Sequence, residues 1–191
     1  MEALDFEIGW LLSALNAAHP DAYVFFVGDN GTTSSASIPP FAPNHAKGTL
    51  FEGGVNVPFI VRGPGVRRGV CDALVSVVDL HATMAQLGRA QSTAEDSLSL
   101  VPHFTQPNLV LREWVYSEMF SPNGGAPPFA SHERAIRDAR YKLIRRTGQA
   151  DRFFDLAVDP FELNDLAPSM SPAEQARYDA LVAQLQTLGV G

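Results

Sequence analysis

An aspartate and an asparagine stand side by side directly after a short apolar segment. Residues 22–27 (AYVFFV) are wholly apolar, and Gly28-Asp29-Asn30-Gly31 follows them. In open α/β sheets, ligands bind beyond the carboxyl ends of buried strands. Carboxylate and amide oxygens are hard ligands that suit Ca²⁺ or Mg²⁺. Asp29 and Asn30 are therefore candidate metal ligands, and a simple turn is the alternative because Asp-Asn-Gly is common turn chemistry.

A lysine on a glycine hinge is the second candidate. Lys47-Gly48 opens the stretch KGTLFEGG, which ends at Gly54 and is followed by Val57-Pro58. A lysine in this position can present a compact positive charge to an anion. A solvated surface lysine is the alternative. His45, two residues earlier on the same loop, is a weak candidate to face the same anion, and we expect it to be a solvated loop histidine instead.

Two strands and two helices are expected to position these loops. Helical spacing of apolar residues predicts an amphipathic helix over residues 2–18, and a second helix is predicted over residues 75–87. Residues 22–27 are wholly apolar and residues 57–61 are apolar up to Arg62, which is typical of strands buried on both faces in a parallel sheet. This order of elements indicates an α/β layer architecture.

The pattern changes after about residue 100. Short segments of alternating polar and apolar residues predict antiparallel strands with one wet face. A capping box at Ser171–Glu174 with Pro172 at the first position predicts a last helix that ends at Gly189. A hairpin loop is expected at residues 123–128. The expected strands are residues 113–119, 133–137, 141–146 and 153–156.

Composition narrows the class of partner. The 191 residues are 46% hydrophobic and 18% charged, and their net charge is −7. This acidic balance argues against nucleic acid and anionic membranes as partners. An anionic substrate must therefore be met by local cations. The single cysteine, Cys71, excludes an intrachain disulfide and a zinc–thiolate cluster.

Taken together and in order, these motifs resemble the sulfatase family of the alkaline-phosphatase-like superfamily. Neither the Asp-Asn-Gly segment nor the Lys-Gly-x-x-x-Glu-Gly-Gly-x-x-Val-Pro segment is specific alone. The resemblance continues through nearly the whole chain. Further matching segments are Val75–Met84 with Asp79 and Thr83, Arg134–Arg137, Tyr141–Ile144, Phe154–Leu156, Asp159-Pro160, Glu162 and Leu166.

This resemblance implies a fold in two parts. Residues 1–100 would be the C-terminal part of an α/β catalytic domain, an alkaline-phosphatase-like sandwich fragment with a mostly parallel sheet and flanking helices. Residues 101–191 would be a small α+β subdomain with a four-stranded antiparallel sheet and a C-terminal helix.

The resemblance also implies a mechanism. Family sulfatases attack the sulfur of a sulfate monoester with a formylglycine held near a calcium ion, which is electrostatic stabilisation plus a metal-held nucleophile. Carried over by position, Asp29 and Asn30 would bind Ca²⁺, with Mg²⁺ or Mn²⁺ as alternatives. Lys47 would bind the sulfate, and His45 is the weaker candidate beside it. The expected substrate is a small sulfate ester or a sulfated glycan.

The sequence departs from the family at the nucleophile. Formylglycine is made within a Cys/Ser-x-Pro-x-Arg motif, and Cys71 lies in Val-Cys-Asp-Ala-Leu, without that proline and arginine. Asn56 replaces the usual arginine of the glycine segment. We therefore expect a C-terminal portion of a sulfatase that is inactive alone, with formylglycine in an N-terminal half outside this chain. Pairing with that half or self-association is expected to cover its apolar surface.

Two other functions stay open on sequence alone. The chain could be part of a phosphonate or phosphate monoester hydrolase of the same superfamily, or a non-catalytic relic that acts as an interaction module. Its location, periplasmic or secreted on one hand and cytoplasmic on the other, is also left open.

Overall fold

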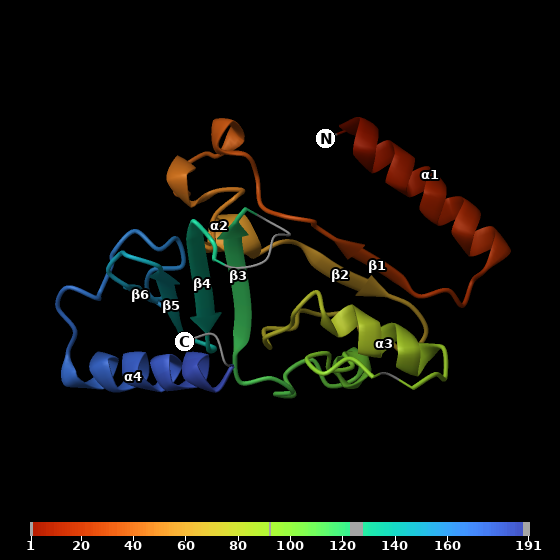
Figure 1. The fold of residues 1–191 in the computed structure, drawn as a ribbon. Helices are drawn as coiled ribbons and strands as arrows, with labels where there is room; N and C mark the ends of the chain where they lie inside the picture. The colour runs from red at the N-terminus through yellow and green to blue at the C-terminus, as the bar shows by residue number, and fades with distance from the viewer. Residues whose placement is uncertain (1, 92, 123–127, 189–191) are drawn as a thin grey trace.

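The structure is a computed structural model that describes residues 2–91, 93–122 and 128–188. Two groups of elements follow each other along the chain (Figure 1). Most of the expected 123–128 loop and the expected helix end at Gly189 lie outside the described residues. The elements are α1 (Glu2–Ala18), β1 (Val24–Val27), η1 (Ser34–Ala36), η2 (Pro43–His45), α2 (Glu52–Val55), β2 (Phe59–Arg62), α3 (Asp79–Leu87), η3 (Val101–Phe104), β3 (Val115–Ser121), β4 (Ser131–Arg137), β5 (Tyr141–Arg146), β6 (Arg152–Asp155) and α4 (Pro172–Thr187).

The first two strands form an antiparallel pair. Val27, the last residue of β1, pairs with Phe59, the first residue of β2, and Val24 pairs with Arg62. The parallel arrangement expected for this layer is therefore wrong for β1 and β2. The physical reason is that the connection formed by residues 28–58 starts and ends at the same end of the strand pair. The chain therefore runs through β2 in the opposite direction to β1. The α/β class itself is confirmed, and β1 and β2 lie between α1 and α3 in Figure 1.

These two strands and α1 keep apolar side chains at the surface. Phe26 and Ile60 face each other across the pair and are 43% and 59% exposed. The expectation that both strands are buried on both faces is therefore wrong. The helix α1 forms where its periodicity predicts, but none of its described residues is buried. None of the described helices has the length and apolar character needed to cross a membrane.

The C-terminal elements form a four-stranded antiparallel sheet in the order β3-β4-β5-β6. This sheet and its last helix confirm the subdomain that the sequence predicts. The capping box at the start of α4 is complete, since Glu174 N donates to Ser171 Oγ and Ser171 N donates to the Glu174 carboxylate. The domain boundary near residue 100 stays a prediction.

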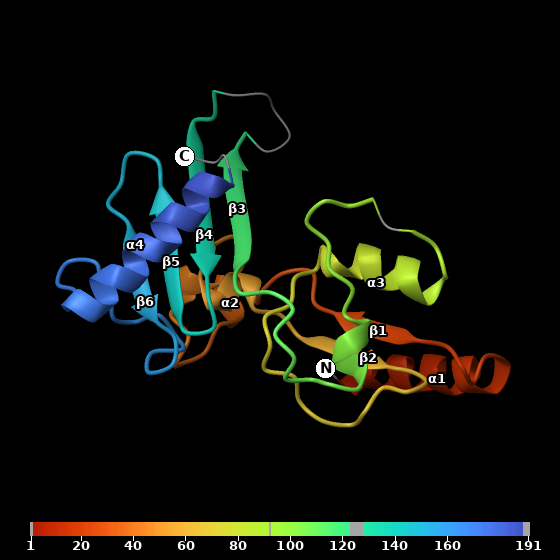
Figure 2. The same ribbon diagram turned by 90° about the horizontal axis from the view of Figure 1, so that it is seen from below.

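The helix α4 covers one face of this sheet (Figure 2). Side chains alternate between the two faces of a strand, and one set packs against α4. This set includes Ile136, Leu143 and Phe153, which are fully buried against Leu181 and Leu185 of α4. The burial of the apolar stripe of α4 confirms the helix position predicted from sequence.

The opposite face of the sheet packs against the segment that contains α2. Ala135, Ile144 and Phe154 form a second buried cluster with Leu50 and Phe51. Leu50 and Phe51 belong to the KGTLFEGG stretch. The C-terminal sheet is thus packed between α4 on one side and the glycine-rich candidate segment on the other.

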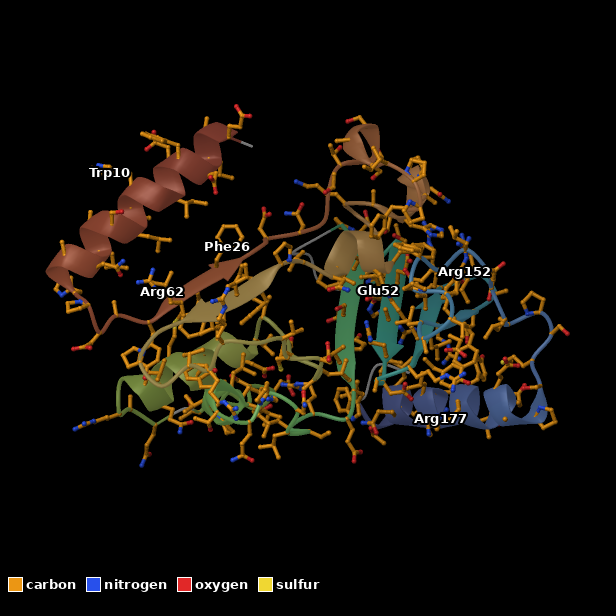
Figure 3. The ribbon with its side chains drawn as sticks, turned by 180° about the vertical axis from the view of Figure 1, so that it is seen from behind. Trp10, Phe26, Glu52, Arg62, Arg152 and Arg177 are labelled. Carbon is orange, nitrogen blue, oxygen red and sulfur yellow. The ribbon has the colours of Figure 1, made fainter. Side chains whose placement is uncertain are left out.

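A buried group of charges fixes this second contact. Glu52 of α2 accepts from Lys142 Nζ at 2.9 Å and from Arg137 NH1 at 2.6 Å. Lys142 Nζ also lies 2.9 Å from Glu162 Oε1, and Glu162 accepts from Glu52 N. Lys142 is 1% exposed and Glu162 is 2% exposed. We call these four residues the joint cluster; Figure 3 labels Glu52 where α2 meets the sheet.

Replacing Leu181 by alanine tests the packing of α4. Leu181 is 5% exposed, and removing a buried leucine side chain leaves a cavity. We expect a loss of about 2–5 kcal/mol in the free energy of unfolding. Denaturant titration measures it, and a loss near zero would show that α4 does not pack on the sheet in solution.

Replacing Lys142 by methionine tests the joint cluster. The substitution leaves Glu162 buried without its ion-pair partner, and breaking a buried pair from one side costs about 3–5 kcal/mol of stability. Adding Glu162→Gln should restore part of that loss, because the carboxylate left unpaired is then gone. Unfolding titrations of both single variants and the double variant form a cycle that isolates the coupling.

The matched control is Arg177→Gln on α4 (Figure 3). Arg177 forms an ion pair with Asp138, but its side chain is 53% exposed. Exposed pairs contribute about 0–1 kcal/mol. Equal losses in the Lys142 and Arg177 variants would contradict a special role for the joint cluster.

Candidate functional site

The loop after β1 lies against the glycine-rich segment before β2. Gly28 N donates to Pro58 O at 2.9 Å, Gly31 N donates to Gly54 O at 2.9 Å, and Lys47 N donates to Thr32 O at 2.8 Å. These three backbone hydrogen bonds bracket Asp29 and Asn30. They bring the two candidate motifs to one edge of the sheet.

Glycine is required where the two segments meet. A Cβ atom on Gly31 would lie 1.8 Å from Gly53 O, far inside any van der Waals contact. A Cβ atom on Gly54 would lie 2.2 Å from Thr49 O. The glycines of the Glu-Gly-Gly stretch thus let backbone pack on backbone.

The antiparallel pairing of β1 and β2 is what brings the two segments to one edge. Parallel strands would place the residues after β1 and those before β2 at opposite edges. Because the strands are antiparallel, the carboxyl end of β1 and the amino end of β2 share one edge. Asp29 and Asn30 follow the carboxyl end of β1 as expected, whereas the Lys47 segment precedes the amino end of β2, and the antiparallel pairing brings these two ends together.

Asp29 and Asn30 have the donor chemistry for a hard cation. Asp29 is exposed and Asn30 half-buried. One carboxylate oxygen of Asp29 accepts from Asn30 N at 3.0 Å, which leaves the other oxygen for a ligand. Among the described residues no group of three or more acidic, histidine or cysteine side chains could hold a metal ion. The pair therefore fits part of a metal shell, and most of a six- to eight-oxygen calcium shell would come from elsewhere.

Lys47 is exposed at the same edge. Its backbone is fixed by Thr32, and Gly48 after it has a φ of 85°, in the left-handed region that favours glycine. The described part of the chain shows no ion pair for the Lys47 ammonium group. A positive charge held on a fixed backbone and free of an acidic partner can bind an anion.

His45 lies away from solvent. It is 8% exposed, so the expectation of a solvated loop histidine is wrong. Its ring stacks on Phe51 with centroids 3.6 Å apart and an interplanar angle of 5°. Burial lowers the pKa of His45, and the charges of Arg152 and Lys142 act in the same direction. His45 therefore joins the candidate loop to the core as a neutral ring.

Glu52 and Asn56 have roles that sequence reasoning missed. Glu52 was visible only as a motif position, yet it is the centre of the joint cluster. Asn56, at the position where the family usually has arginine, donates to Glu52 Oε2 at 3.1 Å, and Arg137 from β4 binds the same oxygen. The local sequence does not distinguish Glu52 from a solvated glutamate, because its partners Arg137 and Lys142 lie 85 and 90 positions later.

Known proteins resemble this chain in sequence and in fold. Residues 1–90 match the family model described as Sulfatase. A choline-sulfatase of Rhizobium meliloti (strain 1021) is 28% identical over 189 residues, which cover 93% of this chain and 34% of that protein. By these matches the chain is similar to the sulfatase family. It spans about a third of the length of this relative.

Solved sulfatase structures share the fold. A putative sulfatase from Bacteroides thetaiotaomicron superposes with a TM-score of 0.70 at 25% identity, covering 86% of this chain and 36% of that one. A phosphonate monoester hydrolase of Agrobacterium radiobacter superposes with a TM-score of 0.73 at 22% identity, covering 96% and 38%. The second likeness shows the fold alone, and it extends over both parts of the chain.

The burial of His45 predicts a pH dependence of stability. A histidine whose folded-state pKa is lowered takes up a proton more readily in the unfolded state. Stability from the neutral ring is therefore complete above about pH 6.5, the usual histidine value, and falls as the pH drops from there towards the folded-state pKa.

His45→Phe keeps a flat ring on Phe51 and removes the titration. We expect its unfolding free energy to fall less steeply than that of the wild type as the pH is lowered below about 6.5. Denaturant titrations between neutral and mildly acidic pH measure both slopes. Parallel slopes would show that His45 does not titrate differently in the folded and unfolded states.

Proposed function

We propose that this chain supplies metal-binding and sulfate-binding loops to a sulfuric ester hydrolase, as the C-terminal portion of its catalytic unit. The observation that carries the proposal is the set of backbone hydrogen bonds that holds the Asp29-Asn30 loop against the Lys47 segment. Similarity to the sulfatase family supports the reaction class. The substrate is a sulfate monoester of a small molecule or a glycan.

Each residue has a defined task in this proposal. The Lys47 ammonium group binds a sulfate oxygen and opposes the negative charge that develops in the transition state. Asp29 and Asn30 would hold a calcium ion, with Mg²⁺ or Mn²⁺ as alternatives. When bound, such an ion polarises the sulfate group as a Lewis acid. His45 acts as a positioning residue, because its ring is packed on Phe51.

The nucleophile is assigned outside this chain. The sequence contains no Cys/Ser-x-Pro-x-Arg motif in which formylglycine could form. Cys71, the single cysteine, is exposed, and its Sγ donates to Pro107 O at 2.9 Å. The chain alone therefore binds parts of the substrate and metal but does not carry out covalent catalysis.

Two assays of the 191-residue chain test the proposal. With an aryl sulfate and calcium present, we expect no turnover, because removing a nucleophile leaves only residual binding and charge stabilisation. If the chain does hydrolyse the aryl sulfate and Lys47→Ala abolishes that hydrolysis, the claim that the chain is catalytically incomplete is wrong.

Equilibrium binding tests whether the chain binds the sulfate ester through Lys47 and the metal through Asp29. Titration calorimetry should show that Lys47→Ala weakens binding of the aryl sulfate about tenfold or more, the value of one charge-assisted hydrogen bond. Asp29→Ala should weaken Ca²⁺ binding. Arg68→Gln, on an exposed turn, is the charge-matched control and should change neither affinity.

The same titrations test the other candidate functions. The shared fold of a phosphonate monoester hydrolase makes an aryl phosphonate monoester the second probe. Tighter binding of that probe would favour phosphonate chemistry. No binding of either anion, and no effect of Lys47→Ala, would contradict the proposal and leave a non-catalytic interaction module.

A further inference from the structure

A pocket with two arginines in its lining opens beside the backbone of Gly48. A pocket of about 280 Å³ opens between the segment before α2 and the β5–β6 hairpin. Gly48, the residue after Lys47, lines the pocket, and a Cβ atom placed there would meet no atom within 4 Å. Asn44 and Phe51 complete this wall. The pocket is therefore continuous with the backbone that presents Lys47.

Two arginines line the opposite wall. Arg146 of β5 and Arg152 of β6 stand on the sheet face that carries Ile144 and Phe154, since alternate residues of a strand share a face. Figure 3 shows Arg152 near α2 and far from Arg177 on α4. The arginines therefore lie on the face that packs against Leu50 and Phe51 and not on the α4 side of the subdomain.

The charges of these arginines are only partly compensated. The Arg152 guanidinium lies over the Phe51 ring, 5.5 Å from its centroid, and no ion pair of Arg152 is found within the described ranges. Arg146 reaches Glu133 only at 4.0 Å. Two cations and one carboxylate thus line the pocket, in a chain whose net charge is −7. This local excess of positive charge suits an anionic ligand.

Both walls are held in place by contacts outside the pocket. Arg145 donates to both oxygens of Asp151 at 2.6–3.1 Å across the base of the β5–β6 hairpin. Tyr178 of α4 donates to the same carboxylate at 2.6 Å. On the other wall, Phe51 packs between His45 and Phe154. Pre-positioned walls lower the entropy cost of holding a ligand.

We propose that this pocket is a subsite for a second anionic group, a sulfate or carboxylate, of the substrate whose ester sulfate is bound at Lys47. The inference rests on the proposed function of that neighbouring site. Arg152 is the principal specificity-determining residue, because a guanidinium can bind a sulfate or carboxylate through two parallel hydrogen bonds. Arg146 supports it, and Asn44 and Gln149 offer neutral donors in the same pocket. The substrate class is accordingly a polyanionic sulfated sugar, and a sulfate ester that carries a cationic group is disfavoured.

The test compares two probes by titration calorimetry on the 191-residue chain. The probes are a disulfated glucosamine and the matched monosulfated glucosamine. We expect the disulfated sugar to bind about 10- to 100-fold more tightly, the value of a hydrogen-bonded charged group. Arg152→Gln should remove this preference without changing the affinity for the monosulfated sugar.

Two further variants test whether the preference for the disulfated sugar follows the charge of the pocket. Glu133→Gln removes the one carboxylate of the pocket and should increase the preference for the disulfated sugar several-fold. Arg68→Gln matches the charge change of Arg152→Gln outside the pocket and should leave the preference unchanged. Thermal melting of each variant shows whether it is folded. If Arg152→Gln does not fold, Arg146→Gln provides the same comparison, with a smaller reduction expected.

The outcomes separate this inference from the proposed function. If Lys47→Ala weakens both probes but Arg152→Gln leaves the preference intact, the subsite is wrong and the sulfate site stands. If Arg152→Gln removes the preference while Lys47→Ala has no effect, the pocket binds an anion independently of Lys47, and both the proposed function and the link of this pocket to it fail. A chain that binds neither probe at millimolar concentration overturns both.

Discussion

The buried ion pair between Glu52 and Lys142 is the constraint on which the rest of the structure depends. Glu52 belongs to the glycine-rich segment before β2, and Lys142 belongs to the C-terminal sheet. Burying either charge alone would cost several kcal/mol, so the two parts of the chain are stable together only when these side chains meet. Arg137 and Glu162 complete the group, and burial raises the pKa of Glu162 although Lys142 beside it acts in the opposite direction. Leu50 and Phe51, next to Glu52, then pack on the sheet, which fixes the backbone that presents Lys47.

Sequence patterns predicted those features that depend on local interactions. The capping box of α4 and the alternation of polar and apolar residues in β3–β6 are patterns among neighbours in sequence, so residue types are sufficient to predict them. The pairing direction of β1 and β2 depends on a connection of some thirty residues, which fixes no direction by its composition. The prediction that β1 and β2 are buried on both faces was wrong for a related reason. An apolar segment shows that a strand can be buried, but only the other elements around it decide whether Phe26 and Ile60 are covered.

The same distinction between local and distant interactions applies to the candidate site. Asp29, Asn30 and Lys47 could be selected from sequence because their neighbours and order resemble a known family. The structure adds the backbone contacts that bring them to one edge. His45 was misjudged because its environment is made by Phe51 and by residues more than a hundred positions away, such as Phe161. The role of Glu52 was equally hidden, since a glutamate next to two glycines gives no indication of a lysine ninety residues later.

The distribution of paired and unpaired cations separates structural charges from candidate binding charges. Most cationic side chains of the C-terminal subdomain form an ion pair with a carboxylate, as in Arg140–Asp155 and Arg145–Asp151. These pairs close hairpins and turns, where an unmatched charge would serve no structural purpose. Lack of a partner is not sufficient evidence for a ligand site, since Arg68 also has no ion pair in the described part of the chain and lies on an exposed turn. Arg152 differs because its charge is held over Phe51 in a pocket that begins one residue after Lys47. In a chain with a net charge of −7, Lys47 and Arg152 have no ion-pair partner among the described residues, which is the physical reason for proposing an anionic ligand here.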